Sequence, residues 1–219
     1  MKNTIKYLIL LIIYLVCGVN LQAQNYTFRN VVMSDGLSGL LVNAIYKDSE
    51  GFVWLGTDNC LDRFDGVKVR HYEFRGVDSG RKKRVNCITE TADNQLWVGN
   101  GIGLWRLNRA NGQLERIVSE KIDFAVNTLL PDGDILYIGT EKGLFIQKDG
   151  QLLQVLTDRN MLAACNRIMD LCLNEDKSAL WLATVQGLFS YSLKDGKIDS
   201  WHFQENVPEA DYFRCLTRI

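Results

Sequence analysis

One short pattern recurs four times along this chain of 219 residues. Each copy has an aromatic residue inside an apolar run, a small residue two positions later and a second marker six positions later. The aromatic residues are Trp54, Trp97, Tyr137 and Trp181, at intervals of 43, 40 and 44 residues. The second markers are Cys60, Gly103, Gly143 and Gly187. A regular period of this length indicates a repeat architecture, in which each copy is one supersecondary unit.

Each copy has the pattern of four short strands separated by turn residues. The strands expected in the first two copies are Val42–Lys47, Phe52–Thr57, Leu61–Asp65, Val67–Phe74, Val85–Glu90, Leu96–Gly99, Leu104–Leu107 and Leu114–Val118. Four strands every 40 to 44 residues match the blade of a β-propeller. A β-sandwich does not predict a fixed period, and a helical solenoid would show a 3.6-residue apolar stripe. We therefore predict an all-β propeller of four-stranded blades, an incomplete ring with about four and a half blades.

The repeat also predicts the role of its individual positions. The glycine two positions after the aromatic residue, present in the first three copies, fits a place with no room for a side chain. The later glycine, present in the last three copies, fits a turn with positive φ. Asp-Gly and Asn-Gly pairs are expected to close the hairpins between third and fourth strands; they are Asp65-Gly66, Asn111-Gly112, Asp149-Gly150 and Asp195-Gly196. The repeat aromatics and their partners Trp105, Phe145 and Phe189 are expected in the core.

The N-terminus has the form of an export signal. Lys2 and Lys6 precede an apolar run from Tyr7 to Val19, and Ala23 precedes a polar stretch. A basic start, a short apolar core and a small residue before the cleavage point are typical of a secretory signal peptide. We predict a signal peptide over 1–23 and a partial propeller over 24–219. A short signal anchor is the alternative.

Five cysteines follow the predicted signal peptide: Cys60, Cys87, Cys165, Cys172 and Cys215. Their number is odd and their spacing matches no zinc pattern. Cys87, Cys172 and Cys215 lie in apolar runs, where a cysteine usually behaves as a small buried hydrophobic residue. Whether any of the five forms a disulfide stays open.

The amino-acid sequence of the first copy resembles that of a known family. Residues 35–38 read Asp-Gly-Leu-Ser, residues 42–57 carry the strand, turn and Trp-Leu-Gly-Thr sequence, and the likeness continues to Gly66. This is similar to the two-component regulator propeller repeat. The four copies together extend the resemblance over the chain after residue 23, with departures at Cys60, Asn100, Tyr137 and Ala183.

The resemblance implies the periplasmic sensor region of a hybrid two-component system histidine kinase of the Bacteroidetes type. Such sensors commonly detect oligosaccharides released from glycans and form homodimers, and their kinase follows a membrane segment. The implied chain is exported to the periplasm, with the full-length parent anchored in the inner membrane. Neither a kinase motif nor a phospho-acceptor histidine is present in these residues, so we expect no enzyme activity from them.

The expected units are 34–76, 77–119, 120–160, 161–205 and the start of a fifth at 206–219. Phe213–Thr217 resembles Val85–Thr89, the first strand of the second unit. Tyr26–Met33 is expected to form a lone strand before the first unit. On this basis we expect a fragment of a longer sensor.

Charge and residue counts limit the other function classes. The 25 Lys and Arg against 26 Asp and Glu provide no concentrated basic face for nucleic acid. With two histidines and no marked pair of carboxylates, we assign no catalytic residue, cofactor or metal ligand. Trp201 is the weak candidate for a ligand-binding residue, because it lies in a less regular segment. The alternatives to a sensor are an exported propeller enzyme, such as a polysaccharide lyase or glycoside hydrolase, and a protein-binding scaffold.

Overall fold

The computed structural model describes residues 5–7, 30–76, 83–117, 122–156, 167–201 and 213–217. The chain divides into two units, Met1–Val31 and Val32–Ile219, and the fold below is that of the second. Residues 5–7 form a helical turn, and the rest of the predicted signal peptide over 1–23 lies outside the described residues. Among the described residues there is no helix with the length and apolarity of a membrane span.

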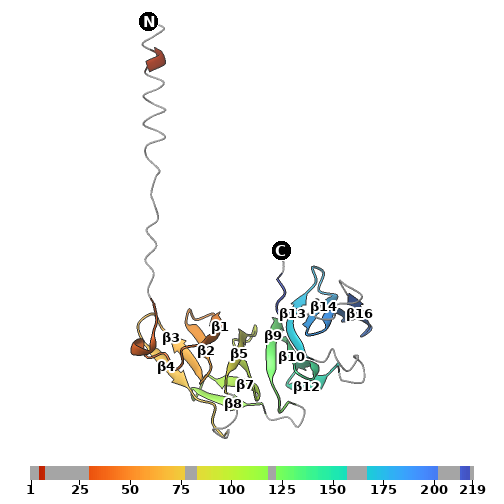
Figure 1. Cartoon of the computed structure of the whole chain (residues 1–219), viewed down its shortest axis with the longest axis horizontal. Coiled ribbons are helices and arrows are strands. Elements are labelled where there is room, and N and C mark those ends of the chain that lie inside the picture. Colours follow the sequence, from red (N-terminus) through yellow and green to blue (C-terminus); the bar gives the residue numbers. More distant parts are fainter. Residues whose placement is uncertain are drawn as a thin grey trace. The chain divides into compact units, whose positions relative to one another are not determined.

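The second unit consists of four antiparallel four-stranded sheets, each made from consecutive strands (Figure 1). Blade 1 contains β1 (Val42–Lys47), β2 (Val53–Thr57), β3 (Leu61–Phe64) and β4 (Val69–Tyr72). Blade 2 contains β5 (Val85–Glu90), β6 (Leu96–Asn100), β7 (Gly103–Asn108) and β8 (Gln113–Arg116). Blade 3 contains β9 (Val126–Asp132), β10 (Ile135–Thr140), β11 (Gly143–Lys148) and β12 (Gln151–Gln154). Blade 4 contains β13 (Ile168–Leu173), β14 (Ala179–Thr184), β15 (Gly187–Ser192) and β16 (Ile198–Trp201). The predicted all-β class of four-stranded blades is confirmed.

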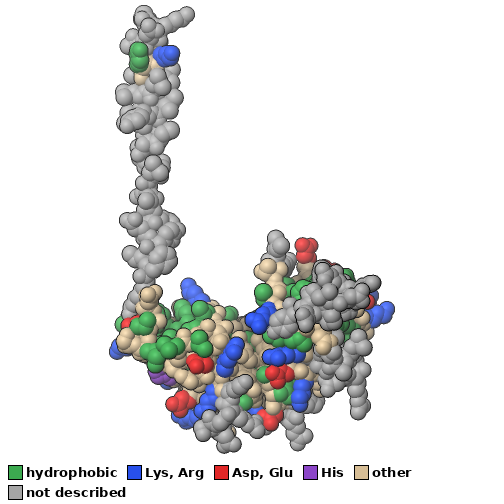
Figure 2. All heavy atoms as spheres, in the orientation of Figure 1, with side chains coloured by type: hydrophobic (Ala, Val, Ile, Leu, Met, Phe, Trp, Pro, Cys, Tyr) green, Lys and Arg blue, Asp and Glu red, His purple; other side chains and the backbone are tan. Residues whose placement is uncertain are grey.

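The first strand of every blade lies next to the first strand of the following blade. Contacts join β1 to β5, β5 to β9 and β9 to β13. These four strands are therefore the inner strands, and β4, β8, β12 and β16 are the outer edge strands. Lys and Arg side chains alternate with Asp and Glu over the visible face, so neither charge covers it alone (Figure 2).

The hydrophobic core lies between consecutive blades, because a four-stranded sheet has two faces to cover and no core of its own. The layer between blades 1 and 2 contains Trp54, Tyr72, Val85 and Trp105. Trp97, Val126 and Phe145 lie in the layer between blades 2 and 3. Tyr137, Ile168, Leu182 and Phe189 lie in the layer between blades 3 and 4.

The glycine after the repeat aromatic has the predicted steric role. A Cβ on Gly56 would lie 2.5 Å from Val85 Cγ1, and a Cβ on Gly139 would lie 2.7 Å from Ile168 Cγ2. Val85 and Ile168 each belong to the inner strand of the next blade. The missing side chain therefore allows successive blades to approach closely.

The turn glycines also have the predicted backbone. Gly103, Gly143 and Gly187 have φ values of 145°, 110° and 143°. In the hairpin between β11 and β12, Asp149 and Gly150 have φ values of 50° and 73°, and Lys148 pairs with Gln151. Two central residues with positive φ define the type I′ turn, whose twist matches that of paired strands.

Trp181 differs from the other repeat aromatics. Trp54, Trp97 and Tyr137 are buried by the next blade, whereas Trp181 is half-buried. Within the described residues no further four-stranded sheet packs against its face of blade 4. The opposite face of blade 1 shows the same effect, because Ile45 is 70% exposed whereas its counterpart Ile88 is buried. The prediction that Trp181 is a core residue is therefore only partly correct.

The lone strand predicted over Tyr26–Met33 is wrong in its described part. Met33–Asp35 form the 3-10 helix η1, and residues 30–32 are not in a strand. The Val32 N–H donates to Asp35 Oδ2 at 3.0 Å, and Gly36 follows with φ 100°. These two features turn the chain before β1, because an Asp side chain that binds a nearby backbone N–H competes with extended structure.

The cysteines are only partly as predicted. Cys60 is buried, Cys87 and Cys172 are partly buried, and all three are free thiols. Cys215 is exposed, which contradicts its expected burial. Its segment, residues 213–217, lies beside blade 4 and not in a sheet, since the Leu216 N–H donates to Asp170 Oδ2 at 2.8 Å. Cys17 and Cys165 lie outside the described residues.

Candidate ligand site at the mouth of the inner strands

Three asparagines occupy the same place in successive inner strands. Asn43, Asn86 and Asn127 are the second residues of β1, β5 and β9. Asn86 Nδ2 donates to the backbone oxygen of Val126 at 2.9 Å, and Asn127 Nδ2 donates to that of Ile168 at 2.8 Å. Each of these two side chains therefore joins its own blade to the next one at the start of the inner strand.

A cavity of about 480 Å³ opens beside these asparagines, and we call it the mouth. It lies at the starts of the inner strands and at the turns that join β6 to β7 and β10 to β11. Its lining residues are Asn43, Arg84, Asn86, Gly101, Ala125, Asn127, Glu141, Arg167 and Met169. Met169 takes in β13 the place that asparagine has in the other inner strands. The volume lies in the range of small-molecule sites.

The mouth is rich in hydrogen-bond donors. Arg84 and Arg167 each precede an inner strand, and Glu141 lies in the β10–β11 turn. Arg167 Nη2 lies 3.9 Å from Glu141 Oε1, and both side chains are about half exposed. This distance leaves most of the Arg167 guanidinium available, and guanidinium groups bind carboxylate and other oxygen ligands through paired N–H donors.

Glu141 is the one carboxylate among the described residues that line the mouth. General acid and base catalysis of glycoside cleavage uses two carboxyl groups that flank the scissile bond. The described lining therefore provides groups with the chemistry to bind and orient a ligand, and it does not bring such a carboxylate pair together.

Trp201, the ligand-binding candidate from the sequence, does not belong to the elements that line the mouth. It ends β16, the outer edge strand of blade 4, and its side chain is 41% exposed. Its ring centroid is 4.8 Å from that of Trp181 at an interplanar angle of 53°. The two indoles thus form an aromatic pair on one face of blade 4, and a ligand-binding role for Trp201 stays a prediction.

The residues of the mouth were not identified from the sequence. Arg84, Ala125 and Arg167 precede the inner strands without a motif of their own, and Glu141 is one of many carboxylates in turns. The sequence did contain one indication of the mouth. An alignment of the four copies on their first strands shows asparagine at the second position of that strand in three of them.

Comparison with known proteins agrees with the repeat pattern. Residues 36–59 match the family described as two-component regulator propeller. The resemblance inferred from the sequence is confirmed. Histidine kinase P4 of Formosa agariphila is 32% identical over 79 residues, which are 36% of this chain and 6% of that kinase. The chain thus spans a small part of the curated relative that it matches.

Solved structures show the same relationship. The extracellular domain of a hybrid two-component system from B. thetaiotaomicron is 27% identical, with a TM-score of 0.62 over 77% of this chain and 23% of that chain. Virginiamycin B lyase from Staphylococcus aureus is 15% identical, with a TM-score of 0.60 over 75% of this chain and 56% of that chain. The second likeness concerns the fold alone. The first connects this chain to the extracellular domains of hybrid two-component systems.

Proposed function

We propose that this chain is a ligand-sensing propeller region of a two-component sensor, exported to the periplasm, and that it binds glycan-derived oligosaccharides at the mouth. The observation that carries the proposal is the polar lining of the mouth, contributed by successive inner strands of a regulator-type propeller. A bound ligand there would contact blades 1 to 4 together, so its binding energy could favour one arrangement of neighbouring blades over another.

The chemistry of the lining favours ligands with many oxygen atoms. Amide groups of Asn43, Asn86 and Asn127 suit hydroxyl groups, and the guanidiniums of Arg84 and Arg167 suit a carboxylate or sulfate. Among the described lining residues, these two cationic side chains accompany one carboxylate, that of Glu141. We therefore expect acidic oligosaccharides, such as those with uronate residues, to bind more tightly than neutral ones of the same length.

Calorimetric titration of the full chain with neutral and uronate-containing oligosaccharides tests the proposal. We expect saturable binding of at least one acidic oligosaccharide, and Arg167→Gln should weaken it by roughly tenfold or more, since a hydrogen bond to a charged group contributes about 1.5–3 kcal/mol. Lys197→Gln, in the exposed β15–β16 turn, is the charge-matched control and should leave the affinity unchanged.

Two outcomes would contradict the proposal. Absence of binding across both classes of oligosaccharide would favour a protein-binding scaffold. New reducing ends after incubation with a polysaccharide would favour an exported enzyme, because a sensor returns its ligand unchanged. The link to a kinase is tested separately: the coding sequence in frame beyond Ile219 should encode a membrane span and a histidine kinase.

A further inference from the structure

Blade 1 departs from the other three blades at two neighbouring positions. The first residue of β7, β11 and β15 is glycine, and the residue two positions later is Trp105, Phe145 or Phe189, all buried. In blade 1 these positions carry Cys60 and Asp62. Asp62 is 0% exposed, so a carboxylate is buried where the other blades bury an aromatic ring. Burial of a carboxylate lowers the free energy of unfolding by roughly several kcal/mol unless the carboxylate has polar partners.

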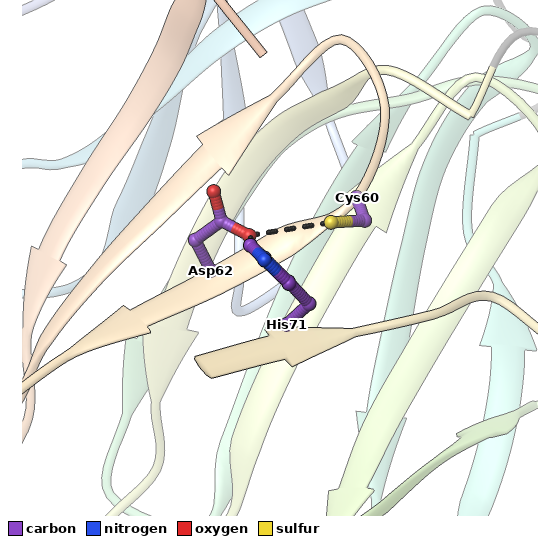
Figure 3. A group of neighbouring side chains, drawn as sticks. All are labelled: Cys60, Asp62 and His71. Atoms are coloured by element: carbon purple, nitrogen blue, oxygen red, sulfur yellow. Dashed lines mark hydrogen bonds and ion pairs between the residues drawn. The ribbon is translucent and has the colours of Figure 1, made fainter. Parts of the chain in front are cut away.

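The two oxygens of Asp62 have different partners. Oδ2 accepts hydrogen bonds from the Ser38 N–H at 2.8 Å and from Ser38 Oγ at 2.7 Å. Oδ1 lies 3.3 Å from Cys60 Sγ and 2.7 Å from His71 Nδ1 (Figure 3). His71 is opposite Asp62 in the β3–β4 pairing, which places the imidazole beside the carboxylate. One oxygen is thus fixed by backbone and hydroxyl, and the other faces a thiol and an imidazole.

These three side chains offer the donor types that zinc prefers. The ligand atoms of Cys60, Asp62 and His71 all lie within 4.8 Å of one another. In a tetrahedral site with Zn–ligand bonds of roughly 2.0–2.3 Å, the ligand atoms lie about 3.3–3.8 Å apart. Shifts of about 1 Å or less would bring the three donors to that spacing. A mixed set of sulfur, nitrogen and oxygen disfavours Ca²⁺ and Mg²⁺, which take oxygen ligands.

We propose that blade 1 binds a Zn²⁺ ion through Cys60 Sγ, Asp62 Oδ1 and His71 Nδ1, with a fourth position open to solvent. This site is separate from the mouth and does not depend on the proposed function. On binding, the thiol of Cys60 releases its proton to solvent and the neutral imidazole carries its proton on Nε2. The His71 side chain is about half exposed, which provides the ion with a path to the buried carboxylate.

The surroundings hold the donors in place. Ser38 Oγ lies 2.9 Å from Thr57 Oγ1, and Thr57 Oγ1 accepts from the Cys60 N–H at 3.1 Å. Hydrogen bonds of this kind orient metal ligands, and their loss typically lowers metal affinity by about 10–100-fold. The three donors come from the β2–β3 turn, from β3 and from the outer strand β4, so a bound ion would cross-link three parts of one blade.

Cobalt spectroscopy of the full chain, freed of metal with a chelator, tests this inference. Added Co²⁺ should produce a thiolate-to-cobalt charge-transfer band and visible bands of a tetrahedral ion, saturating at one equivalent, and Zn²⁺ should remove them. Cys60→Ser should abolish the charge-transfer band. His71→Gln, at a half-exposed position, should leave the circular dichroism unchanged and weaken Co²⁺ binding at least ~10-fold.

Cys172→Ser is the matched control, because it removes a partly buried thiol from another blade. It should keep the band of the unmodified chain. The proposal is overturned if one equivalent of Co²⁺ produces no thiolate band, or if the band persists in Cys60→Ser. It is also overturned if His71→Gln folds and binds Co²⁺ as tightly as the unmodified chain, since Cys60, Asp62 and Ser38 would then form a hydrogen-bonded network only.

Discussion

At the scale of single residues, the glycine two positions after the repeat aromatic in blades 1 to 3 sets how closely two blades approach. A Cβ on Gly99 would lie 2.5 Å from Cys87 Sγ and 2.6 Å from Val126 Cγ1. Gly99→Ala should therefore lower the free energy of unfolding by about 1–3 kcal/mol, the usual cost of overpacking. Denaturant titration measures the change.

Ala183 provides the control for this substitution, because it occupies the same repeat position in blade 4 and is buried there with its methyl group. Ala183→Gly should cost about 1 kcal/mol or less, mainly through backbone entropy. Equal effects of the two substitutions would show that the close approach at Gly99 does not limit the packing of blades 2 and 3.

The pKa and the reactivity of the Cys60 thiol also depend on the surroundings of a single residue. Burial, with a further contribution from the Asp62 carboxylate, raises the pKa of Cys60 from 9.0 to about 12. In the metal-free folded chain at mildly alkaline pH, Cys60 should react with iodoacetamide more slowly than exposed Cys215, because the thiolate is the nucleophile. Peptide mapping after a short exposure measures both rates, and faster modification of Cys60 would contradict the burial.

The same pKa shift makes the stability depend on pH. The folded pKa lies above the unfolded value of 9.0, so the protonated thiol favours folding below about pH 9. That contribution is lost as the pH rises towards about 12. Replacing Cys60 by alanine should remove this part of the alkaline loss of stability.

The sequence predicts residues of the repeat better than residues of the sites. Trp105, Phe145 and Phe189 are buried as expected, because a repeated position has one packing role in each blade. Asp62 and His71 do not share that role and are nine positions apart, so only the β3–β4 register brings them together. The departure at Cys60 was visible in the repeat, but its partners were not.

At the scale of elements, the same aromatic position should contribute differently in different blades. Trp97 is buried between blades 2 and 3, whereas Trp181 is half-buried on a face without a further described sheet. Trp97→Ala should cost about 3–5 kcal/mol, the usual range for a buried Trp. Trp181→Ala should cost about 1–2 kcal/mol, in proportion to the smaller apolar area that it buries.

Denaturant titration of both tryptophan variants tests this difference. The control is Lys197→Gln in the exposed β15–β16 turn, which should change stability by about 0.5 kcal/mol or less. A loss for Trp181→Ala as large as that for Trp97→Ala would contradict the assignment of the core to the layers between described blades.

Strand order and hairpins were predictable at this scale, whereas the segment before blade 1 was not. Asp-Gly and Asn-Gly pairs occur at all four hairpins between third and fourth strands, and their glycines have positive φ. The positions of these hairpins therefore follow from the local preference of such pairs for turns. The segment at Met33–Asp35 also has apolar residues, yet the Asp35 side chain and Gly36 turn it into η1. A local hydrogen bond outweighed the strand propensity of Val31 and Val32.

At the scale of the whole molecule, successive inner strands build the mouth, where we propose that the ligand binds. The starts of β1, β5, β9 and β13 come together only through the packing of four blades. The period of the repeat predicted this arrangement in outline. It did not predict which side chains line the mouth, because the residues before the inner strands follow no repeat pattern.

Hydrogen–deuterium exchange of the full chain, with and without an acidic oligosaccharide that binds it, tests the proposed ligand site. We expect ligand-dependent protection of backbone amides around Arg84, Gly101, Glu141 and Arg167, and none at β16 around Trp201. Protection centred on Trp201, with the mouth unchanged, would contradict the proposed site and would place the ligand on the face of blade 4 that carries Trp201.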